Sequence, residues 1–156
     1  MILLTVVAAI TVLYFIASAF FPRAYEAEIE YAARATGLDE DLIRAVIWTE
    51  SKFDEDAVSG AGASGLMQMT EDTRAFVSER TGAEADGSAR SEIYLGSAYL
   101  RYLLDRCGNE TDALMSYNAG YYNVMRWKAE GSEPYPETRE YMRRVEFARR
   151  VYRYIF

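Results

Sequence analysis

The chain has 156 residues, enough for one domain built around a single hydrophobic core. Its formal net charge of −7 argues against nucleic-acid binding, because a nucleic-acid-binding protein needs a basic face that neutralises phosphates. It contains no histidine and a single cysteine, Cys107, which excludes a Ser-His-Asp triad, a Cys-His pair and the common zinc sites. Carboxylates, tyrosines and amides remain to carry any catalysis, and the sequence indicates neither a cofactor nor a metal ion.

Residues 1–21 form an apolar run without a charged side chain. A helix of this length can cross a bilayer core of about 30 Å, since each residue adds about 1.5 Å. We therefore predict a transmembrane anchor here. Ala17-Ser18-Ala19 has the small-x-small pattern of a cleavage site, so a signal peptide is the alternative. The length of the run and the absence of Lys or Arg before it favour the anchor.

The rest of the chain has the spacing of amphipathic helices nearly throughout. Asp39, Thr70, Ser88 and Asn109 are suited to cap helix starts, and Gly37 and Gly82 to end helices. Basic residues between 139 and 153 alternate with apolar ones, as on the solvated face of a helix. No sheet or repeat is indicated, so we predict a compact all-α domain over residues 25–156. Its helices are expected at 25–36, 39–51, 70–82, 88–107 (the central one), 109–120, 121–129 and after a loop marked by Pro134 and Pro136.

Glu50 is the most informative single position. It follows Ile43 by seven residues, Val46 by four and Ile47 by three, so it continues the apolar stripe of its helix. A carboxyl on such a stripe is desolvated, paired or at the wall of a cleft. Desolvation raises its pKa toward the value that a general acid needs near neutral pH. Position alone does not establish catalysis, because a glutamate at a helix end can reach solvent and structural ion pairs also bury carboxylates.

The glycine-rich segment 60–65 matches the spacing G-x-G-x-x-G of dinucleotide-binding turns. No strand precedes it, no βαβ unit is available, and the lysine of a phosphate-binding loop is missing. We therefore reject nucleotide binding. A tight backbone path close to another element or to a ligand accounts better for the glycines.

Three blocks of the sequence stand out: Glu50-Ser51-Lys52-Phe53-Asp54 with Ala57-Val58-Ser59 and Gly62-Ala63-Ser64-Gly65-Leu66-Met67-Gln68-Met69, then Ser116-Tyr117-Asn118-Ala119-Gly120, then Glu137-Thr138-Arg139-Glu140-Tyr141-Met142. In this order they resemble the signature of the soluble lytic transglycosylase (SLT) domain. Ser116 stands where the second motif usually has alanine and Met142 where the third usually has valine, and neither change removes a functional group. The resemblance extends from Tyr25 to the C-terminus.

The resemblance implies a lysozyme-like helical fold that cuts peptidoglycan glycan strands between N-acetylmuramic acid and N-acetylglucosamine. Glu50 would protonate the leaving oxygen and then deprotonate the C6 hydroxyl, closing a 1,6-anhydro ring without adding water. The enzyme would thus be a lyase with one catalytic carboxyl, whereas ordinary glycosidases pair two. Neither Asp54 nor Asp56 is given the second role by the resemblance, and the 2-acetamido group of the substrate is thought to replace it.

The resemblance also implies a set of substrate-binding residues, and each member could instead have a purely structural role. A methionine can fill a core, an asparagine can end a helix, a glutamate can stabilise the first turn of a helix, and a tyrosine can pack. After Glu50, we expect Tyr117 and Gln68 to matter most and Glu137 least. The complete set is Ser64, Met67, Gln68, Tyr117, Asn118, Glu137 and Tyr141.

Two other functions fit the same residues. A hydrolase of the goose-type lysozyme kind would use water as the acceptor, and a non-catalytic wall-binding or secretion-accessory module would not react at all. A binding module has no need for Glu50 at a desolvated position, which argues against the second. We expect a monomer with a single-pass anchor and the domain on the extracytoplasmic side. Arg23 alone weakly favours the opposite orientation, and the function outweighs it.

Overall fold

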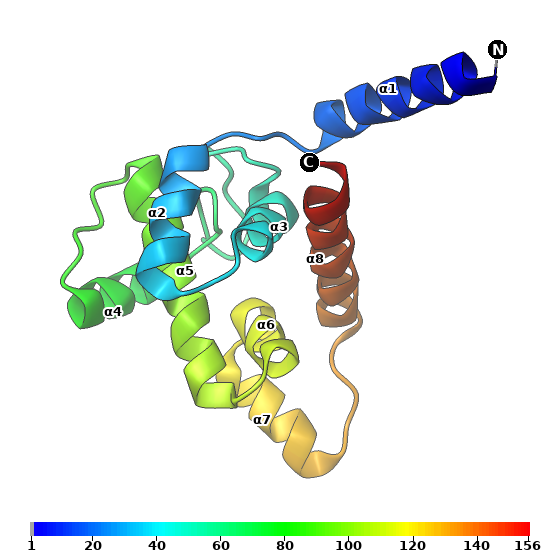
Figure 1. The fold of residues 1–156 in the computed structure, drawn as a ribbon. Coiled ribbons are helices and arrows are strands. Elements are labelled where there is room, and N and C mark those ends of the chain that lie inside the picture. The colour runs from blue at the N-terminus through cyan, green and yellow to red at the C-terminus, as the bar shows by residue number, and fades with distance from the viewer. Residues whose placement is uncertain (1) are drawn as a thin grey trace.

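The computed structural model describes residues 2–156, and their regular structure is helical (Figure 1). No strand occurs among these residues; two isolated antiparallel bridges join Ser64 to Val58 and to Met69. The predicted all-α fold is therefore confirmed. The helices are α1 (Ile2–Phe20), α2 (Glu26–Thr36), α3 (Glu40–Ser51), α4 (Glu71–Thr81), α5 (Ala89–Cys107), α6 (Glu110–Ala119), α7 (Tyr121–Glu130) and α8 (Pro136–Ile155).

The helix starts follow the predicted caps. The side chains of Asp39, Thr70, Ser88 and Asn109 each accept a hydrogen bond from the backbone N–H three residues later. Each cap satisfies a donor that the first turn leaves without an intrahelical partner. One boundary was predicted wrongly: Pro136, which we expected in a loop, is the first residue of α8. Its fixed φ and missing N–H suit that position.

Two helix pairs hold the domain together, α2 against α5 and α3 against α8, and α6 contacts both α5 and α8. Ile93, Leu100 and Leu103 of α5 are fully or almost fully buried, in agreement with its predicted central place. The segment between α3 and α4 packs directly on α5 at Gly96. A Cβ atom at Gly96 would lie 2.7 Å from the Cβ of Met67, so only glycine permits this approach.

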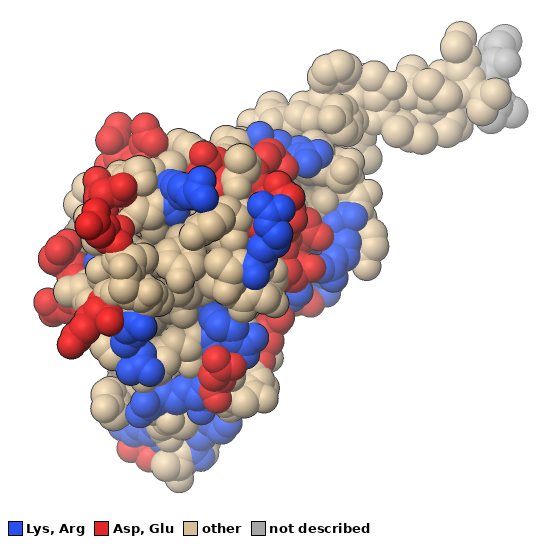
Figure 2. Space-filling view, turned by 60° about the vertical axis from the view of Figure 1, so that its left-hand side comes forward, with Lys and Arg blue, Asp and Glu red and all other residues tan. Residues whose placement is uncertain are grey.

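Helix α1 projects from the domain (Figure 1), and its surface carries no charged side chain, whereas the domain surface is densely charged (Figure 2). Residues Leu3–Phe20 have a mean hydropathy of 2.3, and 6% of this stretch is buried. Length and composition therefore fit a membrane span. A signal sequence meets the same test, so the anchor stays a prediction.

We expect Gly96→Ala to destabilise the domain. Glycine to alanine inside a helix normally stabilises by about 0.5–1 kcal/mol. Here the new methyl group meets Met67, and overpacking costs roughly 1–3 kcal/mol. Urea unfolding of the wild type, Gly96→Ala, Met67→Gly (which removes the opposing Cβ) and the double variant checks this. The double variant should be more stable than the sum of the single effects predicts, and strict additivity would contradict the close contact.

Candidate active site

Glu50 lies in the last turn of α3, on the side that faces α8. The residues before it on this stripe, Ile43, Val46 and Ile47, are completely buried. Glu50 itself is half-buried and lines a cleft of about 520 Å³. A carboxyl on a core-facing stripe thus reaches the wall of a cleft, one of the three situations that the sequence leaves open.

Burial raises the pKa of Glu50 from its ordinary 4.5 to about 7. The nearby Tyr141 hydroxyl and the positive charge of Arg144 act in the opposite direction, and burial outweighs them. The same burial, together with the charge of Glu50, holds the pKa of Tyr141 well above 10. Tyr141 therefore stays a neutral phenol at physiological pH, and Glu50 keeps its proton to a much higher pH than an ordinary glutamic acid does.

The cleft gathers five of the seven predicted substrate-binding residues around Glu50. Gln68 comes from the loop between α3 and α4, Tyr117 and Asn118 from the end of α6, and Glu137 and Tyr141 from the first turns of α8. These segments are distant from Glu50 along the chain, and the α3–α8 and α6–α8 contacts bring them together. Their roles in binding stay predictions, but their common location agrees with them.

Gln68 is held in place by its own side-chain amide. Its Nε2 donates to the carbonyl oxygens of Ala57 (2.9 Å) and Gly65 (3.0 Å). Its backbone has φ +46°, a left-handed conformation that L residues rarely adopt, and these two bonds fix it. Both amide hydrogens are thereby used, so Oε1 is the polar atom with which Gln68 can meet a hydroxyl group of a ligand.

Tyr117 supports the same loop from α6. Its hydroxyl donates to the carbonyl oxygen of Met67 at 2.8 Å. Burial raises the pKa of Tyr117 well above 10, so this donor is kept at neutral pH. Tyr117 thus fixes the residue next to Gln68 and lines the cleft with its ring. The family resemblance implies direct sugar contact, whereas in the structure the hydroxyl group has a protein partner.

Two predicted site residues do not line this cleft. The side chain of Met67 is completely buried against α5, and only its backbone carbonyl reaches Tyr117. Ser64 borders a neighbouring hollow of about 630 Å³. The reason is the path of the backbone: the segment around 64–69 turns back on itself, with a bridge between Ser64 and Met69, so that adjacent side chains point to different sides of the loop.

An ion pair that no sequence pattern indicates anchors this loop. Arg74 pairs with Glu92 at 2.7 Å and donates through Nη2 to the carbonyl (2.7 Å) and hydroxyl (3.1 Å) oxygens of Ser64. Gly65, at φ +78°, passes so close to Glu92 that a Cβ atom would overlap its carboxyl group. Gly65 therefore makes the close backbone approach that was predicted for the glycine-rich segment, whereas a Cβ atom at Gly60 or Gly62 would meet nothing within 4 Å. Ser64 is bound within the protein.

Arg144 is a further cleft residue that sequence reasoning missed. Its Nη2 donates to the carbonyl oxygen of Thr49 at 2.6 Å, which ties α8 to the last turn of α3 beside Glu50. The alternation of basic and apolar residues had indicated only a solvated face for the arginines of this helix. The available signal was spacing: Arg144 follows Tyr141 by three residues, so the two side chains lie side by side on one face of α8.

The fold and the cleft define a helical, lysozyme-like domain that presents one desolvated carboxyl group in a groove. Residues 27–138 match the family model of the transglycosylase SLT domain. This match covers more than half of the chain, and the chain belongs to that family.

Known proteins agree with this assignment. The membrane-bound lytic murein transglycosylase F of Desulfosudis oleivorans is 40% identical over 103 residues, covering 62% of this chain and 22% of that protein. The lytic transglycosylase Slt of Pseudomonas aeruginosa, solved as an inactive mutant, superposes with a TM-score of 0.78 at 31% identity over 85% of this chain. The 70 kDa soluble lytic transglycosylase of Escherichia coli gives 0.79 at 25% identity over 88%. This chain spans 22–25% of the length of these three proteins.

The raised pKa of Glu50 makes stability depend on pH. The folded state binds this proton more tightly than the unfolded chain, so the stabilisation is present at acid pH and is lost as pH rises through about 7. Glu50→Gln keeps a neutral side chain. Relative to the wild type, it should gain about 1–3 kcal/mol of unfolding free energy between roughly pH 4.5 and roughly pH 8. Urea unfolding at both pH values measures the gain. The exposed Glu137→Gln in the same cleft is the control, and an equal gain there would contradict the assignment.

We expect Tyr117→Phe to lower both stability and turnover. It leaves the buried Met67 carbonyl without its donor, which costs about 1–3 kcal/mol, and it loosens the loop that carries Gln68. Thermal unfolding and steady-state kinetics on a glycan fragment measure the two effects. Tyr99→Phe is the matched control, because the Tyr99 ring lies 5.6 Å from that of Tyr117 and no Tyr99 hydrogen bond to this loop occurs among residues 2–156. A Tyr117→Phe variant as stable as this control would refute the role.

Proposed function

We propose that this protein is a peptidoglycan lytic transglycosylase in which Glu50 is the single catalytic acid and base. The observation that carries the proposal is the environment of Glu50: a desolvated carboxyl with a pKa of about 7, in the cleft of an SLT domain. The names of the lytic murein transglycosylase relatives support the same class of reaction and substrate.

A pKa near 7 lets one carboxyl group serve both halves of the reaction. Protonated Glu50 gives its proton to the glycosidic oxygen as the bond to C1 of the muramoyl sugar breaks. The resulting carboxylate then takes the proton of the C6 hydroxyl as its oxygen attacks C1. The 1,6-anhydro ring closes, Glu50 is protonated again, and no water is consumed.

The other carboxylates near Glu50 fit a single-acid mechanism. Glu137 is exposed in the first turn of α8, where the helix dipole stabilises its negative charge. Asp54 and Asp56 are exposed in a turn in which an Asp54 oxygen accepts from the Asp56 N–H, and neither lines the Glu50 cleft. The 2-acetamido group of the substrate would then supply the stabilisation that a second carboxylate gives in ordinary glycosidases.

The cleft residues divide into binding and positioning roles in this proposal. Gln68 offers its amide carbonyl and Asn118 its exposed amide to sugar hydroxyl groups, while the Tyr117 and Tyr141 rings line the cleft beside them. Glu137 lies at the cleft edge. Ser64 and Met67 act through the loop that they hold, and not by direct contact with sugar.

Peptidoglycan lies outside the cytoplasmic membrane, so the proposed activity requires the domain on that side. Helix α1 would be a single-pass anchor, since it is apolar and exposed along almost all of its length. Relatives described as membrane-bound support association with a membrane. We propose a monomer, because one chain supplies the complete cleft.

Glu50→Gln should abolish product formation while the domain stays folded. The amide keeps the shape of the side chain but cannot transfer a proton, and loss of general acid catalysis costs roughly 10²–10⁴-fold in rate. Mass spectrometry of a peptidoglycan digest measures the products. Asp54→Asn is the matched control and should keep wild-type activity. Residual activity of Glu50→Gln within a few-fold of the wild type would refute the catalyst, and product ends heavier by one water would indicate a hydrolase.

A further inference from the structure

The short segment that joins α1 to the domain is held against the domain by a series of contacts. Helix α1 ends at Phe20, and the Trp48 indole Nε1 donates to the Phe20 carbonyl at 2.8 Å. The ring of Phe21 is buried and stacks on the Trp48 ring with centroids 4.5 Å apart. The Tyr152 hydroxyl donates to the Pro22 carbonyl at 3.1 Å. The last residue of the apolar helix and the two residues after it are thus bound to α3 and α8.

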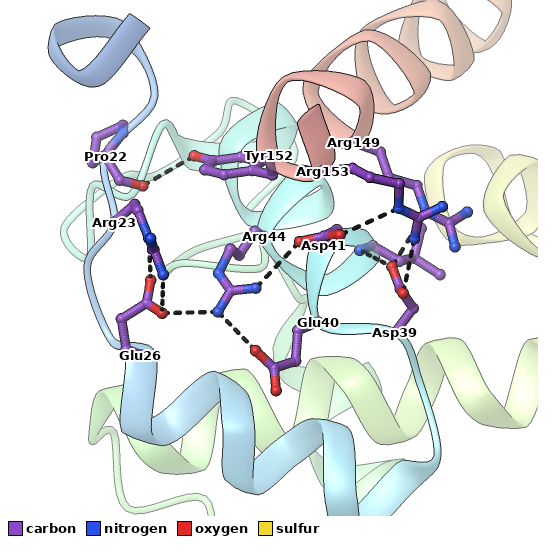
Figure 3. A network of polar contacts seen from close by, with 11 residues as sticks. Pro22, Arg23, Glu26, Asp39, Glu40, Asp41, Arg44, Arg149, Tyr152 and Arg153 are labelled. Carbon is purple, nitrogen blue, oxygen red and sulfur yellow. Dashed lines mark hydrogen bonds and ion pairs between the residues drawn. The ribbon is translucent and has the colours of Figure 1, made fainter. Parts of the chain in front are cut away.

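An ion-pair chain extends this attachment across the domain (Figure 3). Arg23 pairs with Glu26 at 3.0 Å, and the same Glu26 oxygen accepts from the buried Arg44 of α3 at 2.9 Å. Arg44 also reaches Asp41 (3.4 Å), which pairs with Arg153 near the end of α8 (3.3 Å). The chain therefore connects the α1 junction, α2, α3 and α8. Because Arg44 is nearly inaccessible to solvent, its pairs are screened less than exposed ones.

An exposed aromatic and basic stripe on α8 continues from this junction. Phe147, Arg150 and Tyr154 are spaced by three and four residues, so they share one face. Phe147 is 57% and Tyr154 79% exposed, and Arg150 also reaches solvent. The Phe147 ring meets Phe21 edge-on at 5.8 Å, so the stripe begins where α1 ends. Aromatic and arginine side chains beside a membrane span are typical of the headgroup layer.

We propose that the Phe147–Arg150–Tyr154 stripe lies in the headgroup layer of the bilayer spanned by α1, and that the domain sits on the membrane as a rigid body. The aromatic rings enter the interface, and the arginine meets lipid phosphates. Because Phe20, Phe21 and Pro22 are bound to the domain, no free linker remains that would let the domain move away from the membrane surface. This inference rests on the anchor that we proposed above.

The consequence for the proposed function concerns which glycan is cut. Trp48 binds the end of α1, and Glu50 lies two residues later in the same helix. This spacing corresponds to about 3 Å along the helix axis. The cleft therefore stands close to the bilayer. We infer that the substrate is the glycan that adjoins the membrane, and that strands further out are beyond reach.

Fluorescence quenching on the full chain in vesicles tests the location of the stripe. With Cys107→Ser as background, a dye is attached at Tyr154→Cys or at Tyr122→Cys, an exposed tyrosine of α7 at the other end of the domain (Figure 1). The vesicles contain phosphatidylethanolamine and phosphatidylglycerol with a headgroup-labelled nitroxide lipid as quencher. We expect several-fold stronger quenching at position 154 than at position 122. Equal quenching, or a chain that does not sediment with the vesicles, would overturn the proposal.

A pair of double variants tests whether these side chains cause the contact. Phe147→Ser with Arg150→Gln should reduce quenching at position 154. The control is Phe76→Ser with Arg34→Gln, which also removes one exposed phenylalanine and one exposed i,i+4 ion pair: Arg34 pairs with Glu30 as Arg150 pairs with Glu146. These residues lie away from α1, and their replacement should leave quenching unchanged. Reduced glycan binding with unchanged quenching in the first variant would instead make the stripe a glycan surface. Glu50→Gln should quench like the wild type, which separates this proposal from the catalytic one.

Discussion

The burial of Glu50 at the α3–α8 contact is the constraint to which the rest of the site is adjusted. An ionised carboxyl on a core-facing stripe is unfavourable, and the group responds by holding its proton up to a pKa of about 7. The surrounding core compensates for this cost, since the neighbouring positions of α3 are completely buried. Tyr141 and Arg144 moderate the shift without cancelling it. The carboxyl can therefore exist in both forms at the pH of its environment.

A comparison with Arg44 on the same helix shows why Glu50 differs from a structural charge. Burial alone would lower the pKa of Arg44, but hydrogen bonds to Glu26 and Glu40 and the charges of these two carboxylates outweigh it and keep the pKa raised. Asp41 completes the set of carboxylates around the guanidinium group. Glu50 has a phenol and one exposed arginine instead of a matched partner. Pairing preserves a buried charge for structure, whereas incomplete pairing leaves a proton available for chemistry.

Much of the fold could be predicted because its signals are local. Asp39, Thr70 and Ser88 cap their helices through bonds to residues three positions away. The apolar stripe that Glu50 continues can be recognised from the helical spacing of neighbouring residues alone. The loop around Gln68 could not be predicted in the same way. Its conformation depends on the Arg74–Glu92 pair and on Tyr117, whose partners lie 10–50 residues away and carry no pattern in the sequence. Ser64 and Met67 were therefore expected in the cleft, although their side chains face other parts of the loop.

The same long-range contacts explain why so small a domain can hold a preformed cleft. The loop that carries Gln68 has almost no regular structure of its own, yet bonds from α3, α4 and α6 reach it: Ser51 donates to Leu66 at 2.8 Å, Arg74 to Ser64, and Tyr117 to Met67. Each supporting helix is in turn packed on α5 or α8. A ligand in the cleft thus meets groups whose positions are fixed before it binds, and little ordering entropy remains to oppose binding. In our proposal, the contacts of Phe20, Phe21 and Pro22 with Trp48 and Tyr152 extend this principle to the whole domain, because they would fix the cleft relative to the apolar helix.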